Sequence, residues 1–154
     1  DSLEDPTLLP WISKLLTAAR IHGSSFVFEV SEASALNNLK ATKSLSSGLH
    51  QLNCLFALDH VGNDNPSLKY LSHFDVNFLK IDGAHIKNLT SSEASQELVK
   101  GITELARGKD ILTIAEHVQD PACLAQLWQH GINLIQGHYF QKPEDNLSYD
   151  FTAE

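Results

Sequence analysis

Apolar residues in this chain gather in short runs, and longer stretches with a different spacing separate these runs. The runs have the length of strands, and they are apolar almost throughout, as strands are when a parallel sheet buries both of their faces. They predict five strands, at residues 26–30, 54–58, 78–81, 111–115 and 133–135.

The stretches between the runs carry apolar residues three and four positions apart, which predicts helices. Thr90-Ser-Ser-Glu93 has the spacing of a capping box, and Asp120-Pro121 places a capping carboxylate and a proline at a helix start. Trp11 and Trp128 fall on apolar stripes, so we expect both in the core. The alternation of strand and helix is typical of an α/β fold. The predicted helices cover residues 6–22, 35–50, 68–71, 93–107 and 121–130.

A polar residue stands at or just beyond the end of each predicted strand. If the strands are parallel, their carboxyl ends share one edge of the sheet, and these polar groups converge there. Both a TIM-type barrel and a doubly wound sheet build their sites in this way, although a closed barrel usually takes about 250 residues. The polar residues are Glu29, Asp59, Lys80 with Asp82, Glu116 and Gln136.

Composition narrows the classes of function. A chain of 154 residues that is 42% hydrophobic holds one domain with a packed core. Its net charge of −8 argues against binding nucleic acid. No apolar run approaches the ~18 residues of a membrane span, so we expect no membrane insertion. Cys54 and Cys123 lack the spacing of metal ligands and agree with a reducing compartment, which predicts a cytoplasmic location.

Five ordered motifs carry a resemblance to a known family. They are Phe28-Glu-Val-Ser-Glu32, Ala57-Leu-Asp-His-Val-Gly62, Phe78-Leu-Lys-Ile-Asp82, Ile114-Ala-Glu-His-Val-Gln119 and Ile135-Gln-Gly-His-Tyr-Phe140. In this order and spacing they resemble the EAL domain family, barrel-fold phosphodiesterases that hydrolyse the bacterial second messenger cyclic di-GMP. The resemblance implies a TIM-type (β/α) barrel, of which this chain supplies about five strands and their helices.

The resemblance covers only the later part of the family's domain. It implies that residues 1–154 are the C-terminal part of a single EAL-like domain. The EAL tripeptide, an arginine that holds ligand phosphate and an asparagine ligand are then expected in a segment before Asp1.

The resemblance also implies roles for single residues. Glu29 and Asp59 match metal ligands of the family, and Glu116 matches an acidic residue of its site. Lys80 matches the lysine that assists the attacking water. Glu32 matches the glutamate that positions the loop after the second strand predicted here.

Two further residues complete the expected site. Gln136 matches a glutamine of the family's site, and His117 stands where the family has a glycine. The ring of His117 could stack against a guanine. We expect cyclic di-GMP to contact Glu29, Asp59, Lys80, Glu116, His117 and Gln136.

Two departures from the family pattern predict that hydrolysis is lost or severely weakened. Active members have a second aspartate after Asp59, where this chain has His60, and the loop Gly62-Asn-Asp-Asn-Pro66 differs from the family's Gly-Thr-Gly followed by Tyr and Ser. Hydrolysis with two metal ions needs carboxylates that bridge the ions, which an imidazole cannot do. Lys80 and Glu32 then remain as remnants of the catalytic set, the metal ligands Glu29, Asp59 and Glu116 are vestigial, and no cofactor is expected.

The sequence therefore predicts a degenerate EAL-type domain, not an enzyme, that binds cyclic di-GMP and signals to a protein partner. One alternative is a residual phosphodiesterase that uses Glu29, Asp59, Glu116 and Lys80 with Mg²⁺ or Mn²⁺. Another is an interaction module that has lost nucleotide binding as well.

Narrower alternatives concern single groups at the predicted site. The lysine could serve only as a structural ion pair with Asp59 or Glu116. His60 and His117 could join the carboxylates in a nitrogen–oxygen metal site.

The last stretch of the chain indicates a subgroup. Residues 127–140 and the ending Leu147-Ser-Tyr-Asp-Phe151 resemble members of the family that bind cyclic di-GMP without cleaving it. These members control type IV pili and twitching motility together with a PilZ-domain protein. A PilZ-domain partner is the corresponding expectation here.

Overall fold

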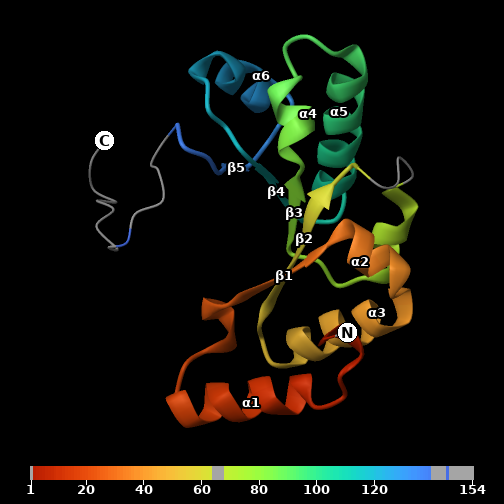
Figure 1. Cartoon of the computed structure of the whole chain (residues 1–154), viewed down its shortest axis with the longest axis vertical. Coiled ribbons are helices and arrows are strands. Elements are labelled where there is room, and N and C mark those ends of the chain that lie inside the picture. The colour runs from red at the N-terminus through yellow and green to blue at the C-terminus, as the bar shows by residue number, and fades with distance from the viewer. Residues whose placement is uncertain (1, 64–67, 140–144, 146–154) are drawn as a thin grey trace.

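The structure is a computed structural model that describes residues 2–63, 68–139 and 145. Its centre is a sheet of five parallel strands in the order β1-β2-β3-β4-β5, so each strand pairs with the next along the chain (Figure 1). All the strands therefore end at the same edge. The strands are β1 (Val27–Ser31), β2 (Leu55–Val61), β3 (Phe78–Ile81), β4 (Leu112–Ala115) and β5 (Leu134–Ile135), each overlapping a predicted strand.

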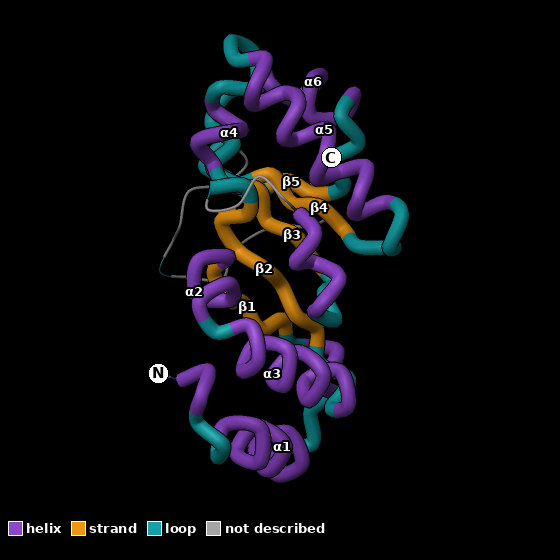
Figure 2. The backbone as a smooth tube through the Cα atoms, turned by 90° about the vertical axis from the view of Figure 1, so that its right-hand side faces the viewer, coloured by secondary structure: helices purple, strands orange, loops and turns teal. Residues whose placement is uncertain are grey.

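Helical segments connect successive strands. Helix α3 packs against β2, and α5 packs against β4, at opposite ends of the sheet (Figure 2). The fold is α/β and forms part of a TIM-type barrel, as predicted. The helices are α1 (Leu8–Ala19), α2 (Glu32–Asn37), α3 (Leu39–Gln51), α4 (Gly83–Lys87), α5 (Glu93–Arg107) and α6 (Leu124–Gln129), with 3-10 helices η1 (Ser2–Glu4), η2 (Gly23–Ser25), η3 (Leu68–His73) and η4 (Pro121–Cys123).

Side-chain caps begin several of these helices. The Ser31 hydroxyl accepts the Ser34 N–H at the start of α2, and the Ser92 hydroxyl accepts the Ser95 N–H at the start of α5. The predicted single helix at 35–50 is wrong, because Asn38 adopts a φ of −130° and divides the segment into α2 and α3. Helix α4 was not predicted, because five residues are too few to show a helical repeat.

The two faces of the sheet differ in burial. Alternate side chains of a strand point to opposite faces. Phe56 and Leu58 of β2 are 1% and 0% exposed and lie in the core. On the other face, side chains at or near the beginnings of three strands remain exposed: Val27, Leu112 and Leu134. One face of the sheet is thus covered by helices, while the other presents apolar side chains.

Both tryptophans lie outside the core, so that prediction was wrong. Trp11 is 58% exposed and Trp128 is 52% exposed. Helix α1 packs on α3 and buries Ile12, and the neighbouring Trp11 points elsewhere because successive residues turn by about 100° on a helix. Helix α6 has six residues and buries only Leu127 among them. In the part of the chain that the structure describes, no helix combines the length and the apolar character needed to cross a membrane.

Candidate functional site

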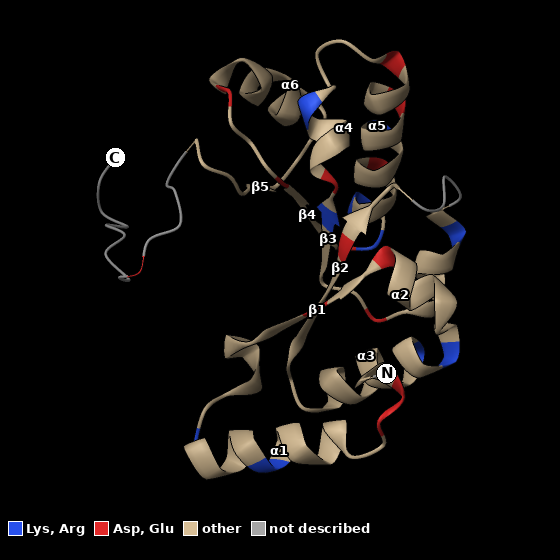
Figure 3. Cartoon of the chain, viewed as in Figure 1, with Lys and Arg blue, Asp and Glu red and all other residues tan. Residues whose placement is uncertain are grey.

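Lys80 lies at the centre of a cluster of charged side chains where the strands end. Its Nζ atom is 2.9 Å from Glu29 Oε2, 3.1 Å from Glu116 Oε1 and 3.5 Å from Asp59 Oδ1. Figure 3 shows acidic and basic segments meeting near the ends of β2 and β3. Burial acts to lower the pKa of Lys80, but hydrogen bonds and charges of the three carboxylates outweigh it and raise this pKa. The lysine is therefore held as an ammonium ion.

Strand pairing explains how these side chains meet. Ser31 pairs with Asp59, and Lys80 pairs with Ile114 two residues before Glu116. The neighbours of Lys80 in β3, Leu79 and Ile81, are fully buried in the core. Because side chains alternate, Lys80 points to the opposite face, where the cluster lies. The structure thus brings together four of the predicted site residues.

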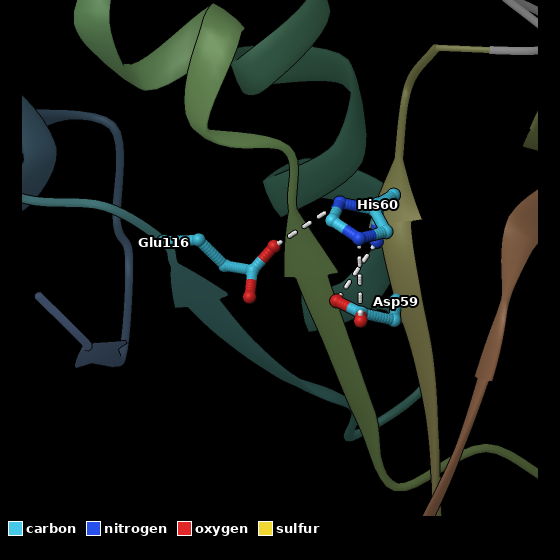
Figure 4. A group of neighbouring side chains, drawn as sticks. All are labelled: Asp59, His60 and Glu116. Atoms are coloured by element: carbon cyan, nitrogen blue, oxygen red, sulfur yellow. Dashed lines mark hydrogen bonds and ion pairs between the residues drawn. The ribbon is translucent and has the colours of Figure 1, made fainter. Parts of the chain in front are cut away.

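His60 joins the same cluster through an unusual backbone conformation. Its φ is +56°, and the pairing of β2 with β3 shifts register between Leu58 and Val61. The Nδ1 atom of His60 lies 2.9 Å from Asp82 Oδ2, and the ring lies 3.6 Å from both Asp59 and Glu116 (Figure 4). Burial acts to lower the pKa of His60, but these carboxylates outweigh it and raise this pKa.

Asp82 is a member of the cluster that the predicted ligand-binding set lacked. Its Oδ1 atom accepts the Ala84 N–H at 2.8 Å and so caps α4, while Oδ2 faces His60. Burial acts to raise the pKa of Asp82, but these hydrogen bonds outweigh it and lower this pKa. The position of Asp82 directly after a strand was a usable signal, although α4 was not predicted.

Glu116 is the most deeply buried carboxylate of the cluster. The residue is 5% exposed, and its Oε2 atom has no hydrogen-bond partner among the described residues. Burial is the largest influence on its pKa, which is raised. The described cluster thus sets the Lys80 ammonium and the His60 imidazole against four carboxyl groups, and burial makes Glu116 harder to ionise than an ordinary glutamate.

The donor atoms of this cluster do not suit a pair of Mg²⁺ or Mn²⁺ ions. Asp59, His60 and Glu116 each offer one ligand atom, and these atoms lie within 4.8 Å of one another. Mg²⁺ prefers an all-oxygen octahedral shell and Mn²⁺ likewise suits oxygen ligands, whereas imidazole suits zinc, copper, iron and nickel. In addition, His60 Nδ1 is bound to Asp82, and the Lys80 ammonium occupies the space between Asp59 and Glu116.

Glu32 lies beside the cluster and contacts the loop after β2. It is fully buried at the start of α2, and its carboxylate accepts the Gly62 N–H at 3.1 Å and the Tyr70 hydroxyl. These bonds connect α2 with both ends of the segment between β2 and η3. Most of the loop that departs from the family pattern, residues 64–66, lies outside the described residues.

A pocket of about 530 Å³ opens between α4 and the segment after β4. His117 forms part of its wall, with a φ of +53°. A Cβ atom on Gly83 would lie 2.5 Å from His117 Nδ1, so the imidazole packs directly on the Gly83 backbone. The lining of the pocket also includes Asp82, Ile86, Val118 and Cys123.

Gln136 follows β5 and is exposed. Its N–H donates to the Ala115 carbonyl at 2.9 Å, and its carbonyl accepts the Val118 N–H at 3.0 Å. Main-chain bonds therefore place Gln136 next to the strand that leads to Glu116 and His117. Neither Gln136 nor His117 is among the side chains that Lys80 joins.

Comparison with known proteins gives consistent results. A sequence model of the family described as "EAL domain" matches residues 1–143. The cyclic di-GMP phosphodiesterase PdeF of Escherichia coli (strain K12) is 33% identical over 133 residues, which are 86% of this chain and 18% of PdeF. The cyclic di-GMP phosphodiesterase PdeB of Shewanella oneidensis is 31% identical over 149 residues, which are 97% of this chain and 17% of PdeB.

Solved structures of EAL domains have the same fold as this chain. The FimX EAL domain from Pseudomonas aeruginosa bound to cyclic di-GMP matches with a TM-score of 0.90 and 40% identity, over 98% of this chain and 62% of that chain. The chain thus spans less than a fifth of the length of the two curated relatives and less than two thirds of the FimX structure. Because the sequence model of the family matches nearly the whole chain and FimX has the same fold, the chain belongs to the EAL domain family.

Proposed function

We propose that this domain is a receptor that binds cyclic di-GMP at the strand ends without hydrolysing it. The contact between His60 and Asp82, 2.9 Å long, is the observation that carries the proposal. In this position active relatives are expected to have an aspartate that serves the metal ions. Here the residue is an imidazole already bound to a carboxylate of its own chain, beside the ammonium of Lys80.

Charge supports binding without metal ions. Cyclic di-GMP carries two phosphate anions, and the protein has a net charge of −8, so the phosphates need local donors. The ammonium group of Lys80 lies at the strand ends. The carboxylates and Gln136 are acceptors for guanine N–H groups and ribose hydroxyls. We propose that Glu29, Asp59, Lys80, Glu116 and Gln136 contact the ligand in these ways.

The pocket beside His117 supports a place for one guanine base. Its volume of about 530 Å³ is in the range of small-molecule sites. A base can stack on an imidazole ring, and such stacking is worth about 1–3 kcal/mol per base for aromatic side chains. His117 is exposed and lines this pocket. We propose that its ring forms one face of the guanine site.

Product formation separates a receptor from an enzyme. The full-length protein is incubated with cyclic di-GMP and Mg²⁺ or Mn²⁺, and the linear dinucleotide product is quantified by chromatography, with PdeF as the active control. We expect no appreciable product, because loss of a bridging carboxylate removes several kcal/mol of transition-state stabilisation. Turnover of about 1 per second or more, the range of ordinary enzymes, would contradict the proposal.

A second variant sharpens this test. Replacing His60 with Asp supplies the carboxylate that active relatives are expected to have. We expect this variant to remain far below full activity, because Asn63 and the residues up to Pro66 depart from the family pattern as well. Full activity of His60→Asp would show that a single residue accounts for the loss.

One observation favours a residual phosphodiesterase as a second candidate. Lys80 contacts Glu29, Asp59 and Glu116, which are the residues that such an enzyme would use. Product that depends on Lys80 would support this candidate. The third reading, an interaction module without nucleotide binding, predicts no heat of binding when cyclic di-GMP is titrated into the protein.

We further propose that the domain passes its signal to a protein partner of the PilZ-domain type in the control of type IV pili. The support is the 40% identity to the FimX EAL domain and the resemblance of residues 127–140 to that subgroup. Co-sedimentation of the full-length protein with PilZ-domain proteins, with and without cyclic di-GMP, tests it. Separately, we propose that residues 1–154 form the later part of a single EAL barrel.

A further inference from the structure

We propose that His60 is a positioning residue, which acts through Asp82 to hold the N-terminus of α4 and so one wall of the pocket for the guanine base. The inference rests on the proposed function for its ligand. Its structural part concerns the protein alone and is tested separately.

The two carboxylate oxygens of Asp82 have different partners. Oδ1 accepts the Ala84 N–H at 2.8 Å, which caps α4. Oδ2 lies 2.9 Å from His60 Nδ1. An ionised carboxylate only accepts hydrogen bonds, so Nδ1 carries the proton and donates it. The imidazole therefore fixes the plane of the carboxylate that caps the helix.

Helix α4 is short and therefore depends on its cap. The helix has five residues, far fewer than the ~12–15 that an isolated helix needs for even marginal stability. Its residues Gly83, Ala84, Ile86 and Lys87 line the pocket. Across the pocket wall, His117 packs on the Gly83 backbone. A shift at the start of α4 would therefore move the stacking ring together with the wall.

The backbone of His60 has a positive φ. A φ of +56° is uncommon for residues other than Gly, although His adopts it more often than most, and contacts around His60 hold it in this conformation. The His60 N–H donates to Asp59 Oδ1 at 3.0 Å, and the ring is bound to Asp82. The end of β2 is thus joined to the start of α4 through one side chain that the family pattern does not predict.

Two substitutions at this position separate the imidazole from the backbone conformation. His60→Gly removes the donor and accepts the positive φ without strain. His60→Asn also tolerates the positive φ and keeps an N–H donor near the place of Nδ1. The second variant is the matched control for the first.

Hydrogen exchange in the full-length protein without ligand tests the structural part. We expect His60→Gly to lower the protection of amides 83–87 about tenfold, since a hydrogen bond to a charged group is lost. His60→Asn should retain most of the protection, and helix α5 should be unchanged in both variants. Unchanged protection of residues 83–87 in His60→Gly would overturn the inference.

Calorimetric titration with cyclic di-GMP tests the functional part. We expect His60→Gly to bind about tenfold more weakly, and His60→Asn to bind nearly as the wild type does. The double variant His60→Gly/Asp82→Ala should bind no more weakly than Asp82→Ala, because both changes break one connection. Additive losses, or a loss in His60→Gly without faster exchange, would show direct contact of His60 with the ligand and overturn the inference. If the wild type does not bind, the proposed function fails and exchange alone decides the role of His60.

Discussion

The Nζ atom of Lys80 lies 2.9 Å from the Oε2 atom of Glu29, although 51 residues separate the two along the chain. The same Nζ atom reaches Asp59 and Glu116, at the ends of the two strands that pair with β3, which are β2 and β4. One ammonium group thus holds together carboxylates from both sides of β3. The stability of the domain and its charge at the strand ends therefore depend on the same residue.

Replacing Lys80 with Met should destabilise the fold. Methionine has a similar length, but it leaves the 5% exposed Glu116 without its ammonium partner. Breaking a buried ion pair by removing one partner costs about 3–5 kcal/mol. We expect a loss of about 3 kcal/mol in the free energy of unfolding, measured by urea denaturation.

Glu29→Gln is the matched control for Lys80→Met, because the Glu29 side chain is 44% exposed. An exposed ion pair contributes less than about 1 kcal/mol. Equal losses in the free energy of unfolding of the two variants would show that the burial of Lys80 and Glu116 adds nothing to stability.

Gly83→Ala should weaken ligand binding through His117. The new Cβ atom would lie 2.5 Å from His117 Nδ1 and 2.8 Å from its Cβ atom, so the imidazole must move. If the ring stacks on a guanine, the affinity for cyclic di-GMP should fall about tenfold, in line with the energy of one stacked base. Calorimetric titration measures this change.

Gly101→Ala provides the control for Gly83→Ala. Gly101 lies inside α5, and a Cβ atom there would meet nothing within 4 Å. This variant should gain about 0.5–1 kcal/mol of stability from helix propensity and leave binding unchanged. Unaltered affinity in Gly83→Ala would place the guanine away from His117.

The pKa of His60 predicts a pH dependence of stability. Burial acts to lower this pKa, but Asp59, Asp82 and Glu116 outweigh burial and raise it. A group with a raised folded-state pKa stabilises fully below its unfolded pKa, ~6.5 for histidine, and this contribution is lost as pH rises through the folded value. The melting temperature of the wild type should therefore fall more from about pH 6 to about pH 8 than that of His60→Asn. An equal fall in both would exclude His60 as the titrating group.

Residues 1–154 expressed by themselves should aggregate or pair with another copy. Val27, Leu112 and Leu134 are 42–44% exposed on one face of the sheet, and β1 and β5 are its outer strands. Unpaired strand edges beside apolar side chains are templates for association. Sedimentation and thermal melts measure the outcome. A soluble monomer that unfolds cooperatively would contradict the account of this segment as part of a larger barrel.

The strands could be predicted from the sequence because a buried strand is apolar almost throughout. Each predicted strand overlaps an observed one, and 78–81 has the observed bounds. Helices were harder, since their limits depend on single residues such as Asn38, whose backbone divides α2 from α3. Trp11 and Trp128 fit apolar stripes, but burial depends on what packs against a helix, which spacing alone does not specify.

The site was predictable in part for a similar reason. Strand order brings Glu29, Asp59, Lys80 and Glu116 to one edge, which follows from parallel pairing alone. The bond between His60 and Asp82 was not predictable, because it requires a positive φ at His60. Nothing in the local sequence indicates that conformation.

The central claim is that the domain binds cyclic di-GMP without metal ions. Calorimetric titration of the full-length protein in buffer with EDTA, repeated with Mg²⁺ in its place, tests this claim most directly. We expect the same affinity in both buffers, because Lys80, Gln136 and stacking on His117 provide the binding groups. Binding that disappears in EDTA and returns with Mg²⁺ or Mn²⁺ would contradict it.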